Sequence, residues 1–537
     1  MITSHAIATL VIFICSIAFV IYPLSVPIRL PYIGHKRVHL NLTSAPILAI
    51  AILWAAQCLA PHRYCYELTA AVDGVKPYNI LILFFSLAYM AITLDITGVL
   101  QAAAFWVSNK GGSNGWKLYL YFYVMLTVLS VFLGNDPVIL SGTAFLVYYT
   151  KVSELNPTSW LISEFAAANT ASMVLFVGNP TNVVICEGFQ VNNAAFTAYT
   201  ILPFVACNLA CFVALGFQFR NPKYIPRRLN AATDLDVRSV LLDPQGAWVG
   251  SVLLGTCLVV IIIVSFFHVD VWKISLPFAV AKLVYDLAWD HYRFRQSHDG
   301  GLQTSPENEE DIMLQALQRH MTLPTSGESN HNRDSATMLK EPPTATVTPV
   351  SVPATPTSLP PSISDPPLKS LTASLMTKRA SLTAHFPTFF TALPRLPFAL
   401  IPFAFSQFIL IEGLAHQGWI DVPYPTIWII GILGIILCNL SGTNIGATIL
   451  LTKVVRAASL PSHTERAAAI ALAVASNIGA VSFTFSASLA GLLWRAILKQ
   501  KGIIIGQRTF AYWNTLPVVV MGAVGLGVVC AEMAVLR

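Results

Sequence analysis

Residues 177–184 read VGNPTNVV and stand in the middle of a long apolar run. Gly178 and Pro180 disfavour a continuous helix there. An unpaired backbone group costs several kcal/mol in hydrocarbon, so such a break has to line a cavity inside the protein. The stretch therefore predicts an interrupted membrane helix whose break binds a solute. The side chains predicted to bind it are Asn179, Thr181 and Asn182.

The composition indicates a membrane protein. The chain has 537 residues, of which 55% are hydrophobic and 11% charged, and its mean hydropathy is +0.64. Soluble globular proteins carry roughly 25% charged residues. The apolar runs predict an all-α polytopic membrane protein with about 11 or 12 transmembrane helices. No segment is suited to form a soluble catalytic domain.

Charge and cysteine content exclude several other classes. The formal net charge is +6, and Lys and Arg cluster in loops, as membrane topology requires. We therefore expect no nucleic-acid partner. The nine cysteines show no CxxC or zinc-type spacing, so we expect neither a metal site nor a cofactor. With no Ser/His/Asp cluster in the spans either, we do not expect an enzyme.

The interrupted run has a counterpart in the second half of the chain. Residues 133–151 read LGNDPVILSGTAFLVYYTK, and 167–182 read AANTASMVLFVGNPTN. Residues 438–453 read CNLSGTNIGATILLTK, and 475–494 read ASNIGAVSFTFSASLAGLLW. Each half contains a polar break, a short apolar segment ending in Thr-Lys, and then an Asn-bearing helix with a second break. The sequence therefore predicts an internal duplication.

Duplicated, interrupted helices are typical of secondary transporters. The duplication aligns Asn169 with Asn477 and the break at 179–182 with 486–488. Half-helix N-termini suit an anion, whereas unwound carbonyls and Asn or Thr oxygens suit a coupling cation, Na⁺ or H⁺. The predicted substrate- and ion-binding residues are Asn135, Asp136, Asn169, Thr170, Asn179, Thr181, Asn182, Ser441, Thr443, Asn444, Ser476, Asn477, Ser486 and Ser488.

Four acidic residues sit in or beside apolar runs, where each costs about 2.5–3.5 kcal/mol to insert. Asp136 opens the short segment after Asn135 and is predicted to hold a proton or cation, or to cap that helix. Glu164 is predicted to relay protons, or to face water near its helix start. For Asp95 and Glu412 we expect a structural role, with pairing to loop cations.

The segments 136–150 and 445–456 are too short to cross as helices, so each is predicted to be a re-entrant hairpin, with a core helix as the alternative. Residues 96–108 are predicted to be an amphipathic helix at the interface. The predicted organisation is 1–43 N-terminal helix and loop, 44–219 first repeat, 220–246 basic cytoplasmic linker, 247–287 start of the second repeat, 288–395 disordered Ser/Thr/Pro-rich cytoplasmic loop, and 396–537 rest of the second repeat.

Our count of membrane crossings leads to two conflicts. The Lys and Arg residues of 220–246 place that loop in the cytoplasm. The basic stretch 495–508 then falls on the opposite side by our count of apolar segments. The same count makes the two halves parallel.

Several segments resemble the arsenite permease branch of the ion transporter superfamily, which also includes sodium/proton antiporters and the melanosomal P-protein. The similarity covers about 25–287 and 396–537. It implies two inverted repeats, each with a re-entrant hairpin and a broken helix that meet near the midplane, and elevator-type movement. The segments are FFSLAYMAITLDITGVLQAAAFW (84–106), FLGNDPVIL (132–140), NTASMVLFVGNPTN (169–182), FILIEGL (408–414) and SASLAGLLW (486–494).

The leading hypothesis is a secondary transporter that exports arsenite or antimonite, driven by the proton-motive force. One alternative is a sodium- or proton-coupled di- or tricarboxylate carrier. Such carriers have Ser-Asn-Thr at both breaks, whereas this chain has Ala168-Asn169-Thr170 and Ser476-Asn477-Ile478, which weakens that interpretation. Further alternatives are an anion channel of the P-protein type and a scaffold acting through 288–395. The expected partners are a small anion, H⁺ or Na⁺, the bilayer and a second copy, in a eukaryotic plasma or vacuolar membrane.

Overall fold

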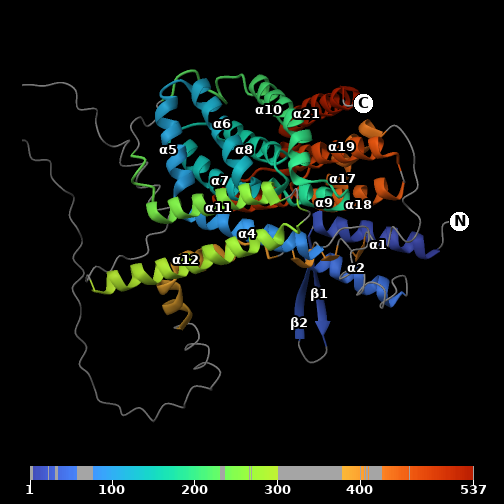
Figure 1. The fold of residues 1–537 in the computed structure, drawn as a ribbon, viewed down its shortest axis with the longest axis horizontal. Coiled ribbons are helices and arrows are strands. Elements are labelled where there is room, and N and C mark those ends of the chain that lie inside the picture. Colours follow the sequence, from blue (N-terminus) through green and yellow to red (C-terminus); the bar gives the residue numbers. More distant parts are fainter. Residues whose placement is uncertain are drawn as a thin grey trace, which may run out of the picture.

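The computed structural model shows an almost entirely helical membrane protein (Figure 1). It describes residues 4–21, 23–30, 34–56, 77–229, 236–264, 267, 269–299, 378–398, 401–403, 405–406, 409–410, 426–458 and 460–535. Most of the predicted loop 288–395, together with Glu412, lies outside the described residues. The predicted domain boundaries stay predictions, with the local differences given below.

The N-terminal part contains a β-hairpin that we did not predict. It follows α1 (Ser4–Ile21) and precedes α2 (Ser44–Ala55). Strands β1 (Leu24–Leu30) and β2 (Gly34–Leu40) are antiparallel, with Leu24 opposite Leu40. The alternation of apolar and polar residues in LSVPIRL has the period of a strand, and this signal was available in the sequence.

Five described helices are long and apolar enough to cross a membrane. Three shorter apolar helices lie within α1, α2 and α17 (Thr426–Leu440). Helix α12 (Trp272–Asp299) continues beyond its predicted end at 287, and 378–385 is also helical. Both ends of the region predicted to be disordered therefore hold helices. The five long helices are α4 (Pro77–Ile96), α6 (Gly115–Leu133), α10 (Asn193–Gln218), α11 (Pro244–Val264) and α21 (Gln507–Val535).

The first re-entrant hairpin is made by two helices. The segment predicted to fold back on itself is one continuous helix, α7 (Asn135–Val152), so the preferred prediction of a hairpin was wrong and the alternative of a core helix is correct. Helices α6 and α7 instead meet at Gly134, whose φ of 83° suits glycine. The polar tip of this hairpin is therefore the junction between the two helices.

The first broken helix follows this hairpin. It consists of α8 (Pro157–Ala171), a loop with the 3₁₀ turn η2 (Phe176–Gly178), and α9 (Pro180–Gly188). The prediction of an interrupted helix is confirmed, and the loop between its halves is called break 1 below.

The second half repeats this pattern. Helices α17 and α18 (Asn444–Ala457) meet around Gly442, whose φ is 79°. Helix α19 (Ser462–Ala480) then leads to the turn η5 (Phe485–Ala487) and to α20 (Leu489–Gln500). Helix α18 is also continuous, so the hairpin predicted within 445–456 was wrong in the same way. The loop between α19 and α20 is called break 2.

The helix predicted at the membrane interface is packed inside the protein. Helix α5 (Val99–Gly111) buries Leu100, Phe105 and Val107 and packs against α6 and α7. Trp106 on its outer side is exposed. The apolar side that we assigned to lipid headgroups is covered by neighbouring helices.

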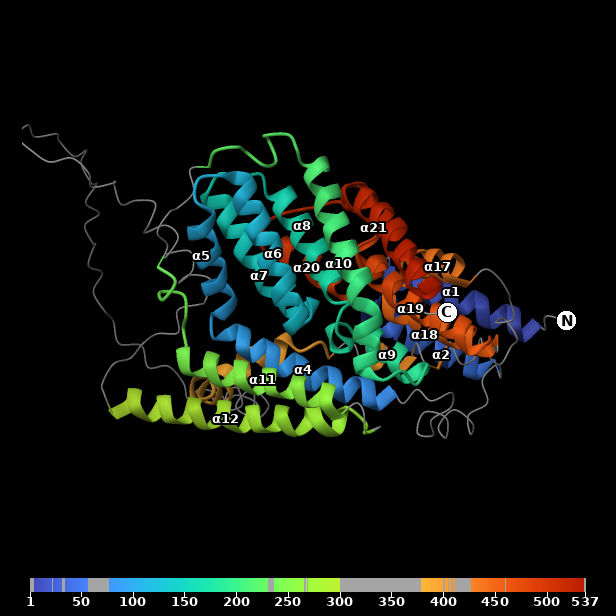
Figure 2. The same cartoon turned by 45° about the horizontal axis from the view of Figure 1, so that its top comes forward.

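The two repeats are inverted, and α10 shows this because its ends mark two sides of the molecule (Figure 2). Near the start of α8, Ser159 donates a hydrogen bond to the carbonyl of Tyr224, just beyond the C-terminal end of α10. Near the start of α19, Arg466 contacts Tyr199, close to the N-terminal end of α10. Helices α8 and α19 therefore start at opposite ends. The inversion implied by the resemblance is confirmed, and our parallel count was wrong.

The basic stretch 495–508 lies on the same side as the linker 220–246, which we call the basic end. Lys501 Nζ donates to the hydroxyl of Tyr148, near the C-terminal end of α7. Gln218, at the end of α10, donates to the carbonyl of Trp513. Each hairpin, α6 with α7 and α17 with α18, returns to the side on which it starts and therefore adds no net crossing. With the hairpins counted in this way, the conflict between the basic residues and the number of crossings disappears.

Helices α4, α11 and α12 pack on one another as a separate layer along one side of the repeats (Figure 2). The layer contacts the first repeat through α4, which packs against α5, α7 and α9. Between the repeats, α10 and α21 run side by side, and both pack against α8 and α19. This arrangement buries the two broken helices at the centre of the molecule.

Candidate functional site

Four helices begin at the polar tips and breaks, and three of them are capped by predicted site residues. Asn179 accepts a hydrogen bond from the backbone N–H of Thr181 at the start of α9. Thr443 caps α18, and Ser488 caps α20, each through its hydroxyl oxygen. A polar cap satisfies one of the free N–H groups of a helix start. The remaining N–H groups give each start a partial positive charge.

Break 1 is held in shape by Asn182. Its side-chain Nδ2 donates to the carbonyls of Ser172 and Leu175, each at 2.8 Å. Gly178 lies so close to the Ser172 carbonyl that a Cβ there would overlap it. The glycine of VGNPTNVV is therefore required by the close approach of two backbone segments.

Asn477 of α19 joins the second repeat to break 1. Its Nδ2 donates to Oδ1 of Asn182 at 2.8 Å. Its Oδ1 accepts from the Ser172 hydroxyl at 3.0 Å and from Asn179 Nδ2 at 3.3 Å. All four side chains are buried. Three residues predicted from the sequence thus meet at one point, together with Ser172, which we did not predict.

Asn169, the counterpart of Asn477, lies at the first hairpin tip. Its Oδ1 accepts from Asn135 Nδ2 at 3.0 Å, and both side chains are buried. The tip lies against break 1, since a Cβ on Gly134 would be 3.3 Å from the carbonyl oxygen of Gly178. The polar tip of the first hairpin therefore lies next to break 1.

Break 2 is organised by Asn439, a residue that we did not predict. Its Oδ1 accepts from the backbone N–H groups of Phe483 and Thr484, and its Nδ2 donates to Ser482. A polar residue in the last turn of an apolar helix was a signal in CNLSGTN that could have identified it.

Several predicted residues bond to their own neighbourhood and not to the Asn477 cluster. Thr170 donates to the carbonyl of Ala166 and contacts the sulfur of Met521. Ser476 donates to a carbonyl of its own helix, and Ser441 donates to the carbonyl of Leu437 in the helix that precedes it. Ser486 contacts the hydroxyl of Thr484 at 3.4 Å. These side chains support the fold around the breaks.

Three other predicted residues keep a polar atom without a hydrogen-bond partner in the described part of the chain. The atoms are Asp136 Oδ1, Thr181 Oγ1 and Asn444 Nδ2, and each is shielded from solvent. Buried polar atoms in folded proteins are almost always hydrogen-bonded. Since these three lie at the starts of α7, α9 and α18, a bound solute or ion is a natural partner for them.

Glu164 is completely buried at the contact of α8 and α7. The hydroxyl of Thr143 donates to both carboxylate oxygens, at 3.0 and 3.1 Å. Gly142 leaves the space for this carboxylate, because a Cβ there would press against it. Glu164 therefore does not face water. Asp136 is the second residue of α7, whose cap is Gly134, so the predicted capping role is wrong.

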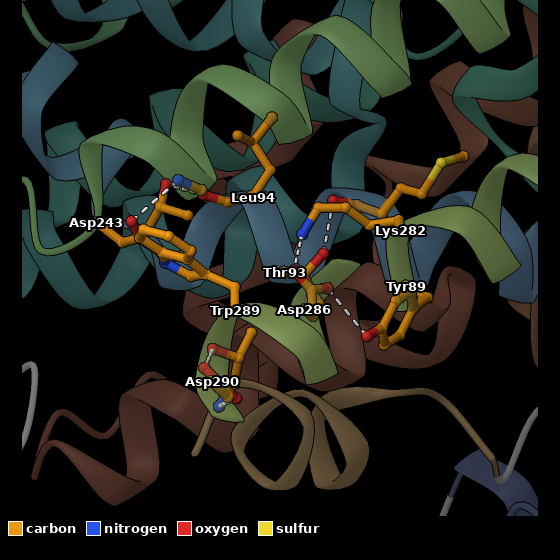
Figure 3. A network of polar contacts seen from close by, with 12 residues as sticks. Tyr89, Thr93, Leu94, Asp243, Lys282, Asp286, Trp289 and Asp290 are labelled. Carbon is orange, nitrogen blue, oxygen red and sulfur yellow. Dashed lines mark hydrogen bonds and ion pairs between the residues drawn. The ribbon is translucent and has the colours of Figure 1, made fainter. Parts of the chain in front are cut away.

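A second polar network lies in the layer of α4, α11 and α12 (Figure 3). Lys282 and Asp286 form an ion pair on α12, and their side chains are 1% and 4% exposed. Tyr89 of α4 donates to Asp286 at 3.0 Å. We did not predict this pair, although two opposite charges four residues apart in an apolar segment were a usable signal.

Asp95 at the end of α4 fulfils the expected structural role. Its carboxylate accepts from the hydroxyl of Ser141 on α7 and pairs with Arg395 at 3.5 Å. Arg395 follows α15 (Pro387–Ala392), so the cation comes from the end of the long loop, as we expected. Asp95 thereby ties this segment to the first hairpin.

Comparison with known proteins gives the family. The citrate transporter family matches residues 6–293, which is more than half of the chain. The chain belongs to the citrate transporter family. Members of this family are membrane transporters, in agreement with the inverted repeats.

Individual relatives are more distant. The chain is 25% identical to the P protein of Homo sapiens over 162 residues, which are 29% of this chain and 19% of that protein. It is 25% identical to an arsenical pump membrane protein of Escherichia coli over 213 residues, or 38% of this chain and 49% of that protein. The chain thus spans about half or less of the length of these relatives. The structure of the Alcanivorax borkumensis YdaH transporter, 12% identical, aligns over 98% of this chain and 96% of that one with a TM-score of 0.39.

Proposed function

We propose that this protein is a secondary active carrier of a small oxyanion or of its uncharged oxyacid, with export of arsenite or antimonite by the proton-motive force as its first candidate activity. The observation that carries the proposal is the bridge from Asn477 to Asn182 across break 1. It joins the two inverted repeats beside the start of α9, where the buried hydroxyl of Thr181 lacks a hydrogen-bond partner within the described residues. In this proposal the carrier works as a homodimer in a plasma or vacuolar membrane.

The break offers neutral hydrogen-bonding groups and helix dipoles to the solute. The N-terminus of α9, capped by Asn179, supplies partial positive charge for an oxygen of the substrate. Thr181 Oγ1 at the start of α9 and Asn444 Nδ2 at the start of α18, which packs against α9, are buried atoms available for further hydrogen bonds. Neutral donors of this kind suit a hydroxylated solute such as arsenous acid, because no full charge has to be compensated.

Asp136 and Glu164 are the carboxylates that support proton coupling. Asp136 lies at the first hairpin tip and has one oxygen without a hydrogen-bond partner in the described residues. Glu164 is buried on α8, the next helix in the chain. A proton taken up by one of these carboxylates on one side and released on the other would accompany substrate movement. Sodium is the alternative coupling ion, bound by the Asn and Thr oxygens of the tips.

A second candidate substrate is a di- or tricarboxylate. The match to the citrate transporter family supports it. The stretches 134–136, 172–182, 439–444 and 477–488 contain no Lys or Arg, so such a substrate would be held by the helix starts alone.

The test uses purified protein in liposomes. Arsenite and citrate fluxes are measured under an imposed pH gradient and, separately, under a sodium gradient, for the natural protein and for Asn477→Ala. Gradient-driven arsenite flux that the substitution abolishes would support the first candidate, and citrate flux with the same behaviour would support the second. Ionic current with a reversal potential but no saturation would contradict a carrier and indicate a channel.

A further inference from the structure

A cavity of about 340 Å³ lies at the end of the molecule opposite the basic end. It is bounded by the C-terminal part of α9, the loop to α10, and the first turns of α10 and α19. Gln190 and Arg466 on its rim are exposed. Its polar lining residues are Gln190, Asn192, Tyr199, Thr200, Ser462, Glu465 and Arg466.

The cavity adjoins the candidate site. Thr200 in its lining is buried, and its hydroxyl donates to the carbonyl of Val174 in break 1 at 3.1 Å. Along α19, Ala469 and Ile470 also line the cavity and lie between Arg466 and Asn477. A helical rise of 1.5 Å per residue puts Asn477 about 16 Å from Arg466 along the axis. One helix thus connects the cavity rim to the bridge between the repeats.

Arg466 is held in place as the cation of this cavity. Its guanidinium lies over the ring of Tyr199, 5.9 Å from the centroid, and donates to the Tyr199 hydroxyl at 3.4 Å. Stacking on an aromatic ring fixes a guanidinium and leaves its edge for bidentate contacts to carboxylates. Within the described residues, no ion pair joins Arg466 to an acidic side chain.

The other charges at this end are few. Glu465 lines the cavity and opposes an anion, and Glu187 lies on the last turn of α9. Arg456 of α18 binds the carbonyl of Gly188, next to the lining residue Phe189. The local balance is near neutral, so the preference of the cavity rests on the fixed position of Arg466.

We propose that this cavity, called the vestibule, is a second binding site for the transported substrate, that it takes small carboxylate anions, and that Arg466 is their counter-charge. The inference rests on the proposed transport function and specifies its substrate class. A positive group in a concave site raises the local concentration of an anion and its rate of entry. Arsenous acid is uncharged at neutral pH and gains nothing from Arg466, so the vestibule favours the carboxylate candidate.

The first test measures citrate uptake into liposomes as a function of concentration. Arg466→Gln should raise KM about tenfold while kcat stays within a factor of two, because local concentration and not translocation is affected. Glu465→Gln should lower KM, and the KM of Arg466→Gln should depend less on salt. Arg508→Gln is the matched control, since Arg508 is exposed at the basic end. An unchanged KM in both vestibule variants would overturn the proposal.

The second test does not need transport. Ala195, a half-exposed lining residue, is replaced by Cys in a background in which Cys15, Cys58, Cys65 and Cys530 are replaced by Ser, and the protein is labelled with a charged thiol reagent. Citrate should slow labelling severalfold, also in Asn477→Ala, and Arg466→Gln should remove this protection. Protection without any citrate flux would support the vestibule while the transport function fails. Absence of protection, protection that survives Arg466→Gln, or protection by anionic lipid in place of citrate would each overturn the proposal.

Discussion

The side-chain amide of Asn477 donates to Oδ1 of Asn182 at 2.8 Å and so links the two inverted repeats at break 1. Asn477→Ala would leave Asn182, Ser172 and Asn179 each without one buried hydrogen bond, at about 1–3 kcal/mol per unsatisfied group. We expect a fall in the unfolding temperature and at least a tenfold loss of transport. Thermal unfolding in detergent and liposome flux would measure these effects.

The control for this change is Thr515→Ala, which removes a hydroxyl that bonds to its own helix at an exposed position. It should leave both unfolding temperature and flux unchanged. A double-mutant cycle of Asn477→Ala with Asn182→Ala should give a coupling of about 0.5–3 kcal/mol, as for groups in direct contact. Additive effects of the two substitutions would show that Asn477 and Asn182 are not energetically coupled.

The glycines beside the two breaks should tolerate no side chain. A Cβ on Gly178 would overlap the Ser172 carbonyl, and one on Gly491 would overlap the carbonyl of Phe485. Both neighbours are backbone atoms, so the loops would have to move. We expect Gly178→Ala and Gly491→Ala to lower stability and to impair transport by similar amounts, because the repeats use glycine in the same way.

The matched control for these glycines is Gly255→Ala in α11, where a Cβ meets nothing within 4 Å. It should be neutral or stabilise the helix by about 0.5–1 kcal/mol. Equal behaviour of all three variants in thermal unfolding would contradict the packing argument.

The sequence predicts the broken helices well because a break in hydrocarbon needs particular residues. Gly178 with Pro180, and the Asn and Ser caps, are local signals that a single chain displays. The polar residue at the end of an apolar helix was a local signal for Asn439, but its partners could not be predicted, because they lie in a loop 43 to 45 residues away that it contacts only after folding. The relative orientation of the two repeats could not be predicted, because a hairpin that returns to its starting side has the same hydropathy profile as helices that cross the membrane.

The Lys282 and Asp286 pair should behave as a unit. Asp286→Leu alone leaves Lys282 charged in a buried position, which costs about 3–5 kcal/mol. Lys282→Met combined with Asp286→Leu removes both charges, and such replacements are often neutral. We therefore expect a large drop in unfolding temperature for the single variant and a partial or full recovery for the double variant.

Tyr89 provides the internal check, because it donates to Asp286 at 3.0 Å. Tyr89→Phe in the natural background should cost about 1.5–3 kcal/mol, as for a hydrogen bond to a charged group. In the double variant the same change should be neutral or favourable. A single variant as stable as the natural protein would contradict the buried ion pair.

Glu164 should set the dependence of transport on the pH gradient. Glu164→Gln keeps the shape of the side chain and can still accept from Thr143, so the packing against Gly142 is retained. Gln imitates the protonated carboxyl but cannot release a proton. We expect substrate exchange between equal concentrations to continue while gradient-driven accumulation is lost, because exchange needs no net proton movement.

Asp136→Asn, examined in the same liposomes, separates the roles of the two carboxylates. Substitution of the residue that carries the proton abolishes accumulation, whereas substitution of the other residue changes only substrate affinity. If both variants still accumulate substrate along a pH gradient, neither residue is the proton carrier, and a sodium gradient becomes the driving force to examine.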